Sequence, residues 1–380
     1  MGEALENRAA HVLRLVGPGV PADAALRGYL SGRAGLREGE GRQVSRAVFS
    51  YYRWLGWLDP DGSAQARIAA ALAMQERFER DPGSVKAEAL GARAVPAWLA
   101  QEMDLPPQYL RSLQSEPALW IRAKVAGLAA VVTDLGSCAP PALPAALAAP
   151  PGLAALRYTG AADLHRTAGY RSGAFEIQDL SSQLVGHACR PEPGETWWDA
   201  CAGEGGKTLH LGDLMRNKGL VWATDRSQRR LAALKRRAAR AGMFNYRCAA
   251  WSGTGRAPFG APCNGVLVDA PCSGVGTWQR NPHARWTTSQ EDVRELASVQ
   301  AALLLAAARA VKPGGRLVYS VCTLTRSETT AVADGFGASH PGFEPWPLPI
   351  AAAPGACRLA LWPQDLDSNG MFLAAWKRVR

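Results

Sequence analysis

The sequence predicts an α/β protein in which a mainly parallel, doubly wound sheet follows an all-helical N-terminal region. Three observations indicate this fold class. From Glu195 onward, short apolar runs alternate with helical patterns, which is typical of a parallel sheet covered by helices on both faces. Between residues 8 and 60, apolar residues recur at helical spacing. The Ala/Pro-rich segment 139–153 reads as a connector, because proline interrupts regular hydrogen-bond ladders.

The N-terminal residues predict a helical bundle with a basic component. Its apolar positions are Ala9, Val12, Leu13, Leu15, Val16, Val44, Ala47, Val48, Tyr51, Tyr52 and Leu55. Further helices are expected at 64–80 and 96–113, then a strand at 118–126 and a short helix to 135. The basic residues of the predicted bundle 8–60 are Arg33, Arg37, Arg42, Arg46 and Arg53. These side chains either face RNA or simply solvate the outer face of the bundle.

The C-terminal part predicts a regular succession of strands and helices. The strands are expected at 196–200, 219–224, 264–269, 316–321 and 371–379, and the helices at 207–216, 227–241, 289–311 and 326–334. The helix 227–241 contains Arg229, Arg230, Lys235, Arg236, Arg237 and Arg240. This helix tracks an RNA backbone or presents a solvated basic face, and both explanations are equally consistent with the pattern.

Length and composition indicate a globular protein of more than one domain. The chain has 380 residues, of which 47% are hydrophobic and 20% charged. The first ten residues lack an apolar signal core, and no later stretch approaches ~20 uninterrupted apolar residues, so a cytoplasmic location is expected. The formal net charge of +10 favours binding to a polyanion, although an arginine-rich coding bias produces the same balance.

The cysteines show no metal-binding pattern. They lie at positions 138, 189, 201, 248, 263, 272, 322 and 357, without a CxxC pair or a nearby histidine cluster, so a metal site is not expected. In a cytoplasmic protein most of them should be reduced core thiols. A cysteine therefore gains a chemical role only from the loop that carries it.

Two loops indicate a cofactor that contains a nucleoside. The glycine-rich turn 199–208 lies between a strand and a helix, and Gly203, Gly205 and Gly206 let backbone N–H groups approach a ligand. The turn fits neither GxGxxG nor GxxxxGK[ST], so alone it leaves a dinucleotide, a phosphate or S-adenosylmethionine open. Asp225 ends the strand Val221–Asp225 at a position suited to accept hydrogen bonds from a ribose diol.

Two further loops place a carboxylate and two cysteines at strand ends. Asp269 and Cys272 follow the strand that ends near 269, and Cys322 follows the strand that ends near 321. The carboxyl ends of parallel strands meet at one edge of a sheet, where ligands bind. Cys322 alone would be interpreted as a core thiol, but its place beside the other three loops favours a chemical role.

These segments together resemble the RsmB/NOP2/Sun family of RNA cytosine-5 methyltransferases. The motifs that carry the resemblance are, in order, DACAGEGGKT at 199–208, ATD at 223–225, DAPCSG at 269–274 and SVCT at 320–323. The resemblance also covers 175–183, 280–286 and 363–372, and it spans about 155–380. Residues 8–60 more loosely resemble the NusB-like helical domain of that family.

The resemblance implies a fold, a cofactor and a partner. The expected fold is a Rossmann-like class I methyltransferase sheet with an N-terminal all-α domain and a small α/β connecting domain. The expected boundaries are a NusB-like domain at 1–85, a connecting domain at 86–155 and a catalytic domain at 156–380. The implied partner is RNA, ribosomal first and transfer RNA second, and a monomer without metal or membrane is expected. The residues implied to bind S-adenosylmethionine are Cys201, Ala202, Gly203, Glu204, Gly205, Gly206, Lys207, Asp225 and Asp269.

The resemblance also implies the catalytic roles. Cys322 is the nucleophile that attacks C6 of the cytosine, which is needed because C5 alone does not accept a methyl group. Asp269 holds the N3/N4 edge of the base, and Cys272 assists release of the product. Lys207 is expected to orient the cofactor loop, while Arg285 contacts an RNA phosphate or is merely solvated. The base must leave its stack to reach Cys322, so single-stranded or loop RNA is expected.

Two departures from the family pattern concern the cofactor. The family commonly has CAAPGGK where this chain has CAGEGGK at 201–207, so Glu204 adds a negative charge near the cofactor. The third cofactor loop usually offers an aspartate, but 245–251 contains none. The adenine would then rely on backbone or apolar contacts around Ala250 and Trp251.

Two other function classes are weighed against this interpretation. One is a methyltransferase of the same fold that acts on DNA or a small molecule, and the N-terminal region and the basic balance argue against it. The other is a catalytically idle RNA-binding factor in ribosome assembly, and the presence of both cysteines and Asp269 argues against that. Transfer of a labelled methyl group into ribosomal or transfer RNA would separate these classes.

Overall fold

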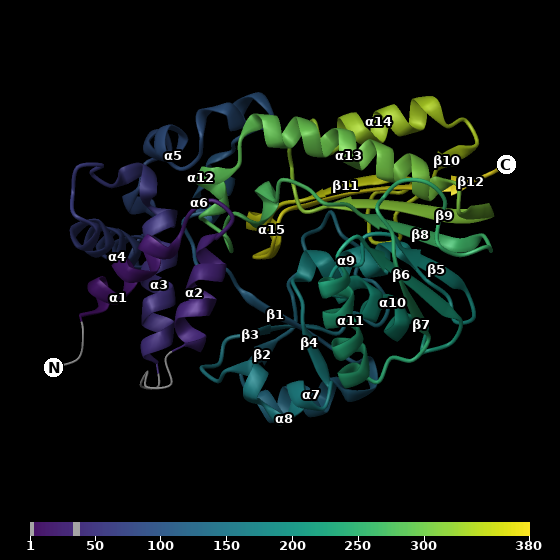
Figure 1. The fold of residues 1–380 in the computed structure, drawn as a ribbon, viewed down its shortest axis with the longest axis horizontal. Coiled ribbons are helices and arrows are strands. Elements are labelled where there is room, and N and C mark those ends of the chain that lie inside the picture. Colours follow the sequence, from purple (N-terminus) through teal and green to yellow (C-terminus); the bar gives the residue numbers. More distant parts are fainter. Residues whose placement is uncertain (1–3, 33–38) are drawn as a thin grey trace. The chain divides into compact units, whose positions relative to one another are not determined.

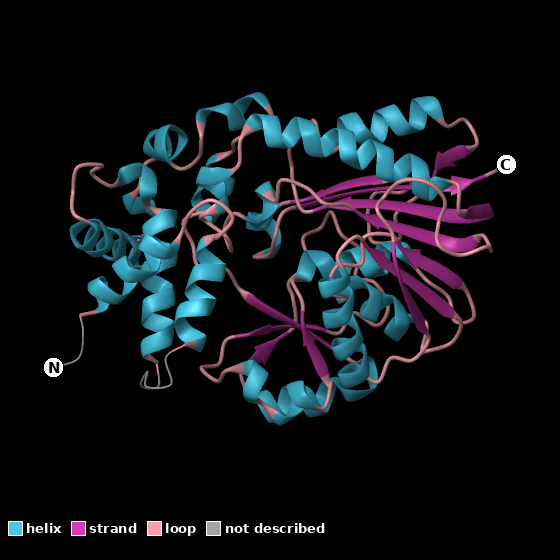
Figure 2. Cartoon of the chain, viewed as in Figure 1, coloured by secondary structure: helices cyan, strands magenta, loops and turns pink. Residues whose placement is uncertain are grey.

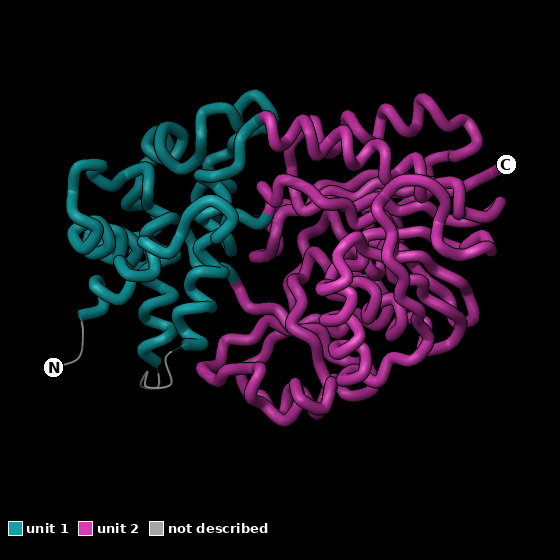
Figure 3. The backbone as a smooth tube through the Cα atoms, viewed as in Figure 1, with its two compact units in different colours: residues 1–117, 277–290 teal, residues 118–276, 291–380 magenta. Residues whose placement is uncertain are grey.

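The computed structural model describes residues 4–32 and 39–380. Arg33 and Arg37, which the sequence placed among the basic helices, lie outside the described residues. The chain divides into two compact units, shown in Figure 3. Unit 1 comprises Met1–Pro117 and Thr277–Gln290, and unit 2 comprises Ala118–Gly276 and Glu291–Arg380. The boundary between the units falls after Pro117, inside the expected connecting segment 86–155, and the segment 277–290 belongs to the N-terminal unit. The domain boundaries at 85 and 155 stay predictions.

Unit 1 is built from helices, which confirms the predicted helical N-terminal region (Figure 1). Its relationship to NusB-like domains stays a prediction. The core contains Ala9, Val12, Val44, Val48 and Ile68, which recur at helical spacing and are fully buried. The helical elements are α1 (Leu5–Leu15), α2 (Ala22–Ser31), α3 (Glu40–Arg53), η1 (Leu55–Trp57), α4 (Ala64–Arg80), η2 (Pro82–Ser84), α5 (Ala87–Arg93), η3 (Ala97–Gln101), α6 (Pro107–Ser112) and α12 (Ala284–Thr287).

Arg285 is a structural residue of unit 1, so the expectation that it contacts RNA or solvent is wrong. Its side chain is fully buried, and its guanidinium donates to the carbonyl oxygens of Ala94 at 3.0 Å and Leu113 at 2.8 Å. The adjacent Trp286 Nε1 donates to the carbonyl oxygen of Tyr52 at 2.6 Å. The segment 277–290 thereby joins helices that are far away in sequence. Arg53 is likewise buried, so its side chain does not face RNA either.

We expect Arg285→Ala to lower the free energy of unfolding by roughly 2–4 kcal/mol, because it leaves buried carbonyl groups without donors and opens a cavity. Urea denaturation followed by tryptophan fluorescence measures this loss. The matched control is Arg294→Ala, since Arg294 is exposed and forms an exposed ion pair with Glu291 at 3.5 Å. Equal stability of the two variants, together with a loss of RNA affinity only for Arg285→Ala, would restore the RNA-contact interpretation.

The main sheet of unit 2 has a parallel half and an antiparallel edge. The parallel strands lie in the order β7-β6-β5-β8-β9. Their bounds are Tyr246–Ala250, Leu220–Asp225, Thr196–Asp199, Cys263–Asp269 and Val311–Val321. The strand β12 (Met371–Arg378) pairs antiparallel with β9 and carries β10 (Phe343–Pro345) and β11 (Arg358–Leu361) as antiparallel partners. The predicted α/β class with a parallel sheet is confirmed.

Helices cover both faces of this sheet, as Figures 1 and 2 show. One face carries α9 (Leu180–Cys189), α10 (Gly206–Leu214) and α11 (Gln228–Ala241), and the other carries α13 (Gln290–Ala308) and α14 (Thr330–Ser339). Along β8, Leu267 packs into the core on one face, whereas Val266 and Val268 pack into the core on the other. Successive side chains of a strand point in opposite directions, so a strand made of consecutive apolar residues presents an apolar surface on both faces of the sheet.

Unit 2 also contains a small antiparallel sheet. Its strands lie in the order β2-β3-β1-β4 and span Cys138–Ala139, Ala155–Tyr158, Leu119–Ala123 and Phe175–Ile177. The other elements near it are η4 (Val125–Gly127), α7 (Leu128–Leu135), η5 (Leu164–Arg166) and α8 (Ala168–Arg171). Only β1 corresponds to a predicted strand. The remaining strands were missed because each has four residues or fewer, which is too short for a clear alternation.

The strand order determines where a ligand can bind. The central strand β5 lies between β6 and β8. The connection after β5 leads to β6 on one side and the connection after β8 leads to β9 on the other, which opens a crevice beyond the carboxyl ends of β5 and β8. The glycine-rich turn and the ends of β6, β8 and β9 all lie at this edge of the sheet. None of the helices in the described part of the chain combines the length and the apolar character that a membrane span requires.

Candidate functional site

The glycine-rich turn between β5 and α10 is attached to the neighbouring strand. The Ala202 N–H donates to the Thr224 carbonyl at 2.8 Å, and the Gly205 N–H donates back to the Ala202 carbonyl at 2.8 Å. Gly205 has φ 88°, and a Cβ there would lie 2.5 Å from Leu234 Cγ. Gly203 also has a positive φ, of 54°. The turn therefore needs glycine at both positions, and its compactness leaves room for a ligand beside the backbone.

Asp225 links the end of β6 to this turn. The side chain is 6% exposed, and its Oδ2 accepts the Gly203 N–H at 3.0 Å while its Oδ1 accepts the Ser227 N–H at 2.8 Å. A carboxylate offers about four lone-pair sites, so each oxygen retains capacity for a further donor. The geometry thus joins two loops that the sequence had assigned to one cofactor.

Asp269, at the end of β8, lies beside the same turn. Its Oδ2 accepts from Lys207 Nζ at 2.8 Å, and its Oδ1 accepts from Ser320 Oγ at 2.7 Å. Burial lowers the pKa of Lys207, but the Asp269 carboxylate outweighs burial and raises that pKa above its usual value. Lys207 is therefore an ammonium group that connects the glycine-rich turn to the strand ends that carry Asp269 and Ser320.

The two cysteines that follow β8 and β9 are in contact. Cys272 Sγ and Cys322 Sγ lie 3.2 Å apart. A hydrogen bond from the Cys272 thiol lowers the pKa of Cys322, and the lowering outweighs the effect of burial, with a further contribution from Lys207. The same hydrogen bond, together with burial, raises the pKa of Cys272 well above its usual value. Of the two sulfurs, Cys322 therefore loses its proton more readily than Cys272, which makes Cys322 the better nucleophile.

The remaining cysteine of the predicted site has a different environment. Cys201 begins the glycine-rich turn, and burial raises its pKa, with the nearby carboxylates of Asp199, Asp269 and Asp225 acting in the same direction. Burial also raises the pKa of Cys263, to about 12. These thiols remain protonated at neutral pH, so Cys322 is distinguished from them by its electrostatic surroundings.

Three buried polar residues at this site were not singled out from the sequence. Asp199 accepts the Thr208 hydroxyl at 2.7 Å, and burial raises its pKa to about 7. Ser320 binds Asp269, as described above. Glu328 lies beyond the SVCT segment and is fully buried. Asp199 and Ser320 belong to the motifs at 199–208 and 320–323, so the sequence offered a signal for both residues. Glu328 lies in a polar stretch that resembles an ordinary loop and offered no such signal.

The segments 175–183 and 363–372, to which the sequence assigned no role, contact each other, and the second also contacts the loop after Cys272. The Asp179 carboxylate accepts the Asn369 N–H at 3.1 Å, and the hydroxyls of Ser181 and Ser368 lie 2.7 Å apart. Gly276 N–H donates to the Cys322 carbonyl at 3.1 Å, and the Gly276 carbonyl accepts from Gly370 at 2.7 Å. A Cβ on Gly276 would lie 2.1 Å from the Gly370 oxygen. The late segment, which includes α15 (Pro363–Leu366), therefore packs directly on the loop that follows Cys272.

Internal ion pairs occupy part of the basic helix α11. Arg237 and Arg240 both bind the buried Glu176 of β4, and Arg230 lies 3.7 Å from Asp225. Four of its basic residues are exposed, namely Arg229, Arg230, Lys235 and Arg236. Arg237 and Arg240, two of the six basic residues proposed to track RNA, thus bind within unit 2 instead.

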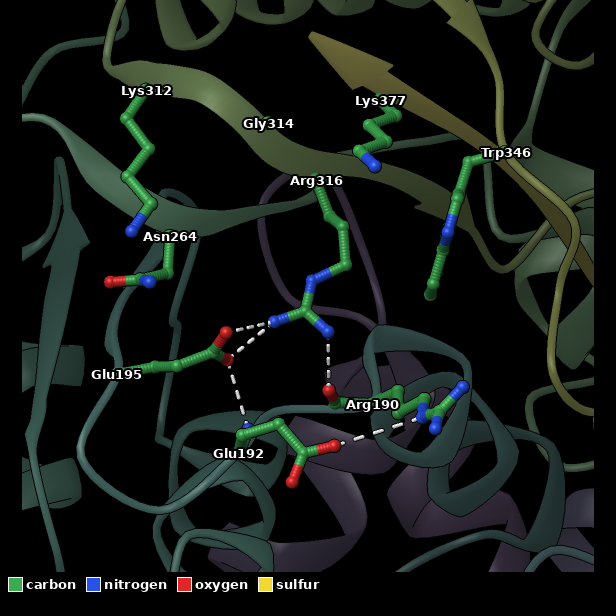
Figure 4. A pocket seen from close by; sticks show the side chains of 9 residues that line it. All are labelled: Arg190, Glu192, Glu195, Asn264, Lys312, Gly314, Arg316, Trp346 and Lys377. Atoms are coloured by element: carbon green, nitrogen blue, oxygen red, sulfur yellow. Dashed lines mark hydrogen bonds and ion pairs between the residues drawn. The ribbon is translucent and has the colours of Figure 1, made fainter.

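A basic cavity of about 430 Å³ lies away from these strand ends (Figure 4). Its lining includes Glu195, Asn264 and Arg316. Glu195 directly precedes β5, Asn264 lies at the start of β8, and Arg316 lies midway along β9 beside Gly265. Arg316 forms an ion pair with Glu195 and donates to the Arg190 carbonyl at 2.8 Å. The cavity is therefore separate from the cysteines. Across residues 4–32 and 39–380, no group of three or more His, Cys, Asp or Glu side chains could hold a metal ion.

Comparison with known families and proteins gives consistent matches. A family model described as 16S rRNA methyltransferase RsmB/F matches residues 187–377. A probable ribosomal RNA small subunit methyltransferase B of Bacillus subtilis is 35% identical over 218 residues, or 55% of this chain and 49% of that protein. Ribosomal RNA small subunit methyltransferase F of Aeromonas hydrophila is 36% identical over 236 residues, or 57% and 48%. The matched region thus spans about half the length of these curated relatives.

A longer but weaker match and two solved structures extend the comparison. Ribosomal RNA small subunit methyltransferase B of Sodalis glossinidius is 28% identical over 386 residues, or 97% of this chain and 81% of that protein. The crystal structure of PH0851 has a TM-score of 0.80 and 21% identity over the whole of both chains. NSun6 from Pyrococcus horikoshii, solved with SFG, has a TM-score of 0.52 and 24% identity, covering 58% of this chain and 57% of that chain. These structural similarities support the fold.

Proposed function

Since the chain belongs to the 16S rRNA methyltransferase RsmB/F family, we propose that it methylates C5 of a cytosine in ribosomal RNA with S-adenosylmethionine. The observation that carries this proposal is the contact between Cys272 and Cys322 at 3.2 Å, beside Asp269. Methylation of an exocyclic amino group needs no thiolate, whereas C5 of cytosine must be activated by a nucleophile at C6. A cysteine with a lowered pKa, in contact with a second cysteine at the strand ends, matches that requirement.

The residues at the crevice fit the cofactor. The turn from Cys201 to Lys207, with the backbone of Ala202, Gly203, Glu204, Gly205 and Gly206, supports a close approach of the ligand, and Asp225 accepts hydrogen bonds from its ribose. Asp269 lies next to Lys207 and borders both the cofactor and the base. When bound, S-adenosylmethionine supplies an electrophilic methyl group on its sulfonium. The two positive φ angles of the turn and the ordered Asp225 carboxylate support this assignment.

The protein's own residues carry the activation of the base. The Cys322 thiolate bonds to C6, and the electron pair of the C5–C6 bond moves onto C5 and the N3/N4 edge. Asp269 stabilises that edge, after exchanging one of its present partners, Lys207 or Ser320, for the base. Once C5 is methylated, a base takes up the C5 proton, the electron pair of that C–H bond re-forms the C5–C6 double bond, and the C6–sulfur bond breaks with its electron pair on the sulfur, which regenerates Cys322. Cys272 assists this release, since its sulfur is the group in contact with Cys322.

The proposal is tested by incubating the protein with labelled S-adenosylmethionine and ribosomal RNA, transfer RNA or DNA, followed by bisulfite mapping of the product. We expect label at a cytosine C5 of ribosomal RNA. Label in transfer RNA or DNA would mean that the substrate is not ribosomal RNA. Label on an amino group would overturn the proposed methylation of C5. Binding of RNA without any transfer would indicate an assembly factor.

We expect Asp225→Ala to weaken binding of S-adenosylmethionine by roughly 10- to 150-fold, because a hydrogen bond to a charged group is worth about 1.5–3 kcal/mol. Asp225→Asn, which keeps an acceptor and the side-chain shape, should weaken binding less. Isothermal titration calorimetry measures both values. The control is Asp334→Ala, an exposed carboxylate of α14, for which affinity should not change. Unaltered affinity in Asp225→Ala would remove this residue from the cofactor site.

A further inference from the structure

Glu328 is a fully buried carboxylate whose two oxygens are bound by four different side chains. Its Oε1 accepts the backbone N–H of Ser273 at 2.8 Å and the amide of Gln300 at 2.9 Å. Its Oε2 accepts the hydroxyls of Thr323 at 3.1 Å and Thr325 at 2.9 Å, together with the hydroxyl of Ser273. A buried carboxylate is stable only when donors replace its lost hydration, and these five donors do so.

The partners of Glu328 come from both cysteine loops. Ser273 directly follows Cys272, and Thr323 directly follows Cys322. The hydroxyls of Ser273 and Thr323 also lie 3.1 Å apart. One carboxylate therefore joins two loops that are 50 residues apart in the chain. Ser273 and Thr323 are each one residue away from a cysteine. A change in their hydrogen bonds to Glu328 should therefore change the distance between the two sulfurs.

The backbone of Glu328 is anchored independently of the loops. Its carbonyl lies 2.6 Å from the Tyr319 hydroxyl, and Gln300 Oε1 lies 2.9 Å from it, so the single proton of that hydroxyl is shared between the two acceptors. Gln300, from α13, donates in turn to the Pro271 carbonyl at 2.9 Å. Because Tyr319 belongs to β9 and Gln300 to α13, the carboxylate is held on the rigid part of the unit, and the loops are held to it.

Electrostatics show that the carboxylate does not serve to activate the thiol. The charge of Glu328 raises the pKa of both Cys272 and Cys322, which opposes formation of the reactive thiolate. A neutral side chain of similar size would favour the thiolate more. The presence of a carboxylate here is explained by its two acceptor oxygens, which accept hydrogen bonds from all five donors. An amide side chain has one acceptor oxygen, and its NH₂ group would face donors.

We propose that Glu328 is a positioning residue that binds the Cys272 and Cys322 loops to one carboxylate and thereby holds the two sulfurs in contact. The inference deepens the proposed methyl transfer and rests on it for its effect on turnover. The part of the proposal that concerns the distance between the two sulfurs can be tested without RNA. The separation of the thiols can be measured in the free protein, because thiols in contact form a disulfide faster than thiols that move apart.

The test compares Glu328→Gln with the wild-type protein in two assays that need no RNA. In the first, diamide oxidises the pair, so that an S–S bond forms and the reagent takes up both protons to become a hydrazine. We expect the rate of Cys272–Cys322 disulfide formation, measured by mass spectrometry, to fall by at least tenfold.

In the second assay, the rate of alkylation of Cys322 by iodoacetamide is measured as a function of pH. The groups that face Cys322 are Cys272, Asp269, Lys207 and Glu328, and the loss of one negative charge should shift its titration to lower pH.

Turnover provides the third readout. In Glu328→Gln, kcat for methyl transfer should fall by at least tenfold, while the affinity for S-adenosylmethionine and the KM for RNA stay within twofold. A more acidic thiol combined with slower turnover is expected only from lost positioning. Global destabilisation would not produce that combination, and thermal unfolding monitors it separately. The matched control is Glu344→Gln, an exposed carboxylate of β10 that carries the same charge change.

A second variant covers the case in which Glu328→Gln does not fold. Ser273→Ala removes one hydroxyl from the junction and keeps the buried charge, so disulfide formation and kcat should fall by a smaller factor with no acid shift of Cys322. The proposal is overturned if either folded variant keeps the disulfide rate and kcat of the wild type. If wild-type protein methylates no RNA, the proposed function fails, yet the diamide and alkylation results still decide the role of Glu328.

Discussion

Replacement of Cys322 by alanine should reduce methyl transfer by roughly four orders of magnitude or more, the scale seen when a covalent nucleophile is removed from an enzyme. Without the thiolate, C5 of the base is never activated. Cys322 is the cysteine of the contacting pair whose pKa is lowered, by the hydrogen bond from Cys272 and with help from the Lys207 ammonium. Filter binding of labelled RNA product measures the rate, and a denaturing gel shows whether any covalent protein–RNA complex forms.

The control for Cys322→Ala is Cys357→Ala, a partly exposed free cysteine outside the site, which should keep wild-type turnover. Binding of S-adenosylmethionine should be unchanged in Cys322→Ala, because the cofactor turn and Asp225 are intact. A Cys322→Ala protein that still forms a covalent complex with RNA would show that another cysteine is the nucleophile.

Replacement of Cys272 by alanine should give the opposite result on the gel, although turnover also falls. If Cys272 assists release, the methylated base stays bonded to Cys322 and a protein band retarded by bound RNA accumulates. The contact of 3.2 Å between the two sulfurs places Cys272 beside the C6–sulfur bond that must break. The expected change is from an undetectable to a stoichiometric complex, measured by denaturing electrophoresis with labelled RNA.

The double variant distinguishes the two roles. Cys272→Ala combined with Cys322→Ala should show no retarded band, since the adduct requires the Cys322 sulfur. Normal turnover by Cys272→Ala would exclude a role in release. A retarded band in Cys322→Ala but not in Cys272→Ala would mean that the two roles are reversed, with Cys272 as the nucleophile.

The parallel part of the sheet could be predicted because its signals are local. Strands β5, β6, β8 and β9 are buried on both faces, so they appear as apolar runs followed by glycine or by a polar residue. The end of each run placed Asp225, Asp269 and Cys322 within about a residue of the strand terminus. The strands β7, β10 and β11 were missed, since they lie at or near sheet edges, where burial is partial and alternation weak.

The interpretation of Arg285 failed for the opposite reason. An arginine in a polar segment next to proline and histidine resembles a surface contact for phosphate. In the structure its guanidinium binds carbonyl groups 172 and 191 residues earlier in the chain. No local pattern encodes such partners, because they exist only once the segment 277–290 has packed into unit 1.

By itself the sequence determined which residues stand at the ends of the parallel strands, and hence the set from which the candidate site is built. Side-chain periodicity and glycine-rich turns act over a few residues, so they can be read without knowing the fold. The tertiary structure alone decided which of these residues touch. The contact between Cys272 and Cys322, the pairing of Lys207 with Asp269 and the junction at Glu328 all join separate loops. Their geometry and the resulting pKa shifts depend on burial and on distances across the sheet, which are set only when the strands assemble.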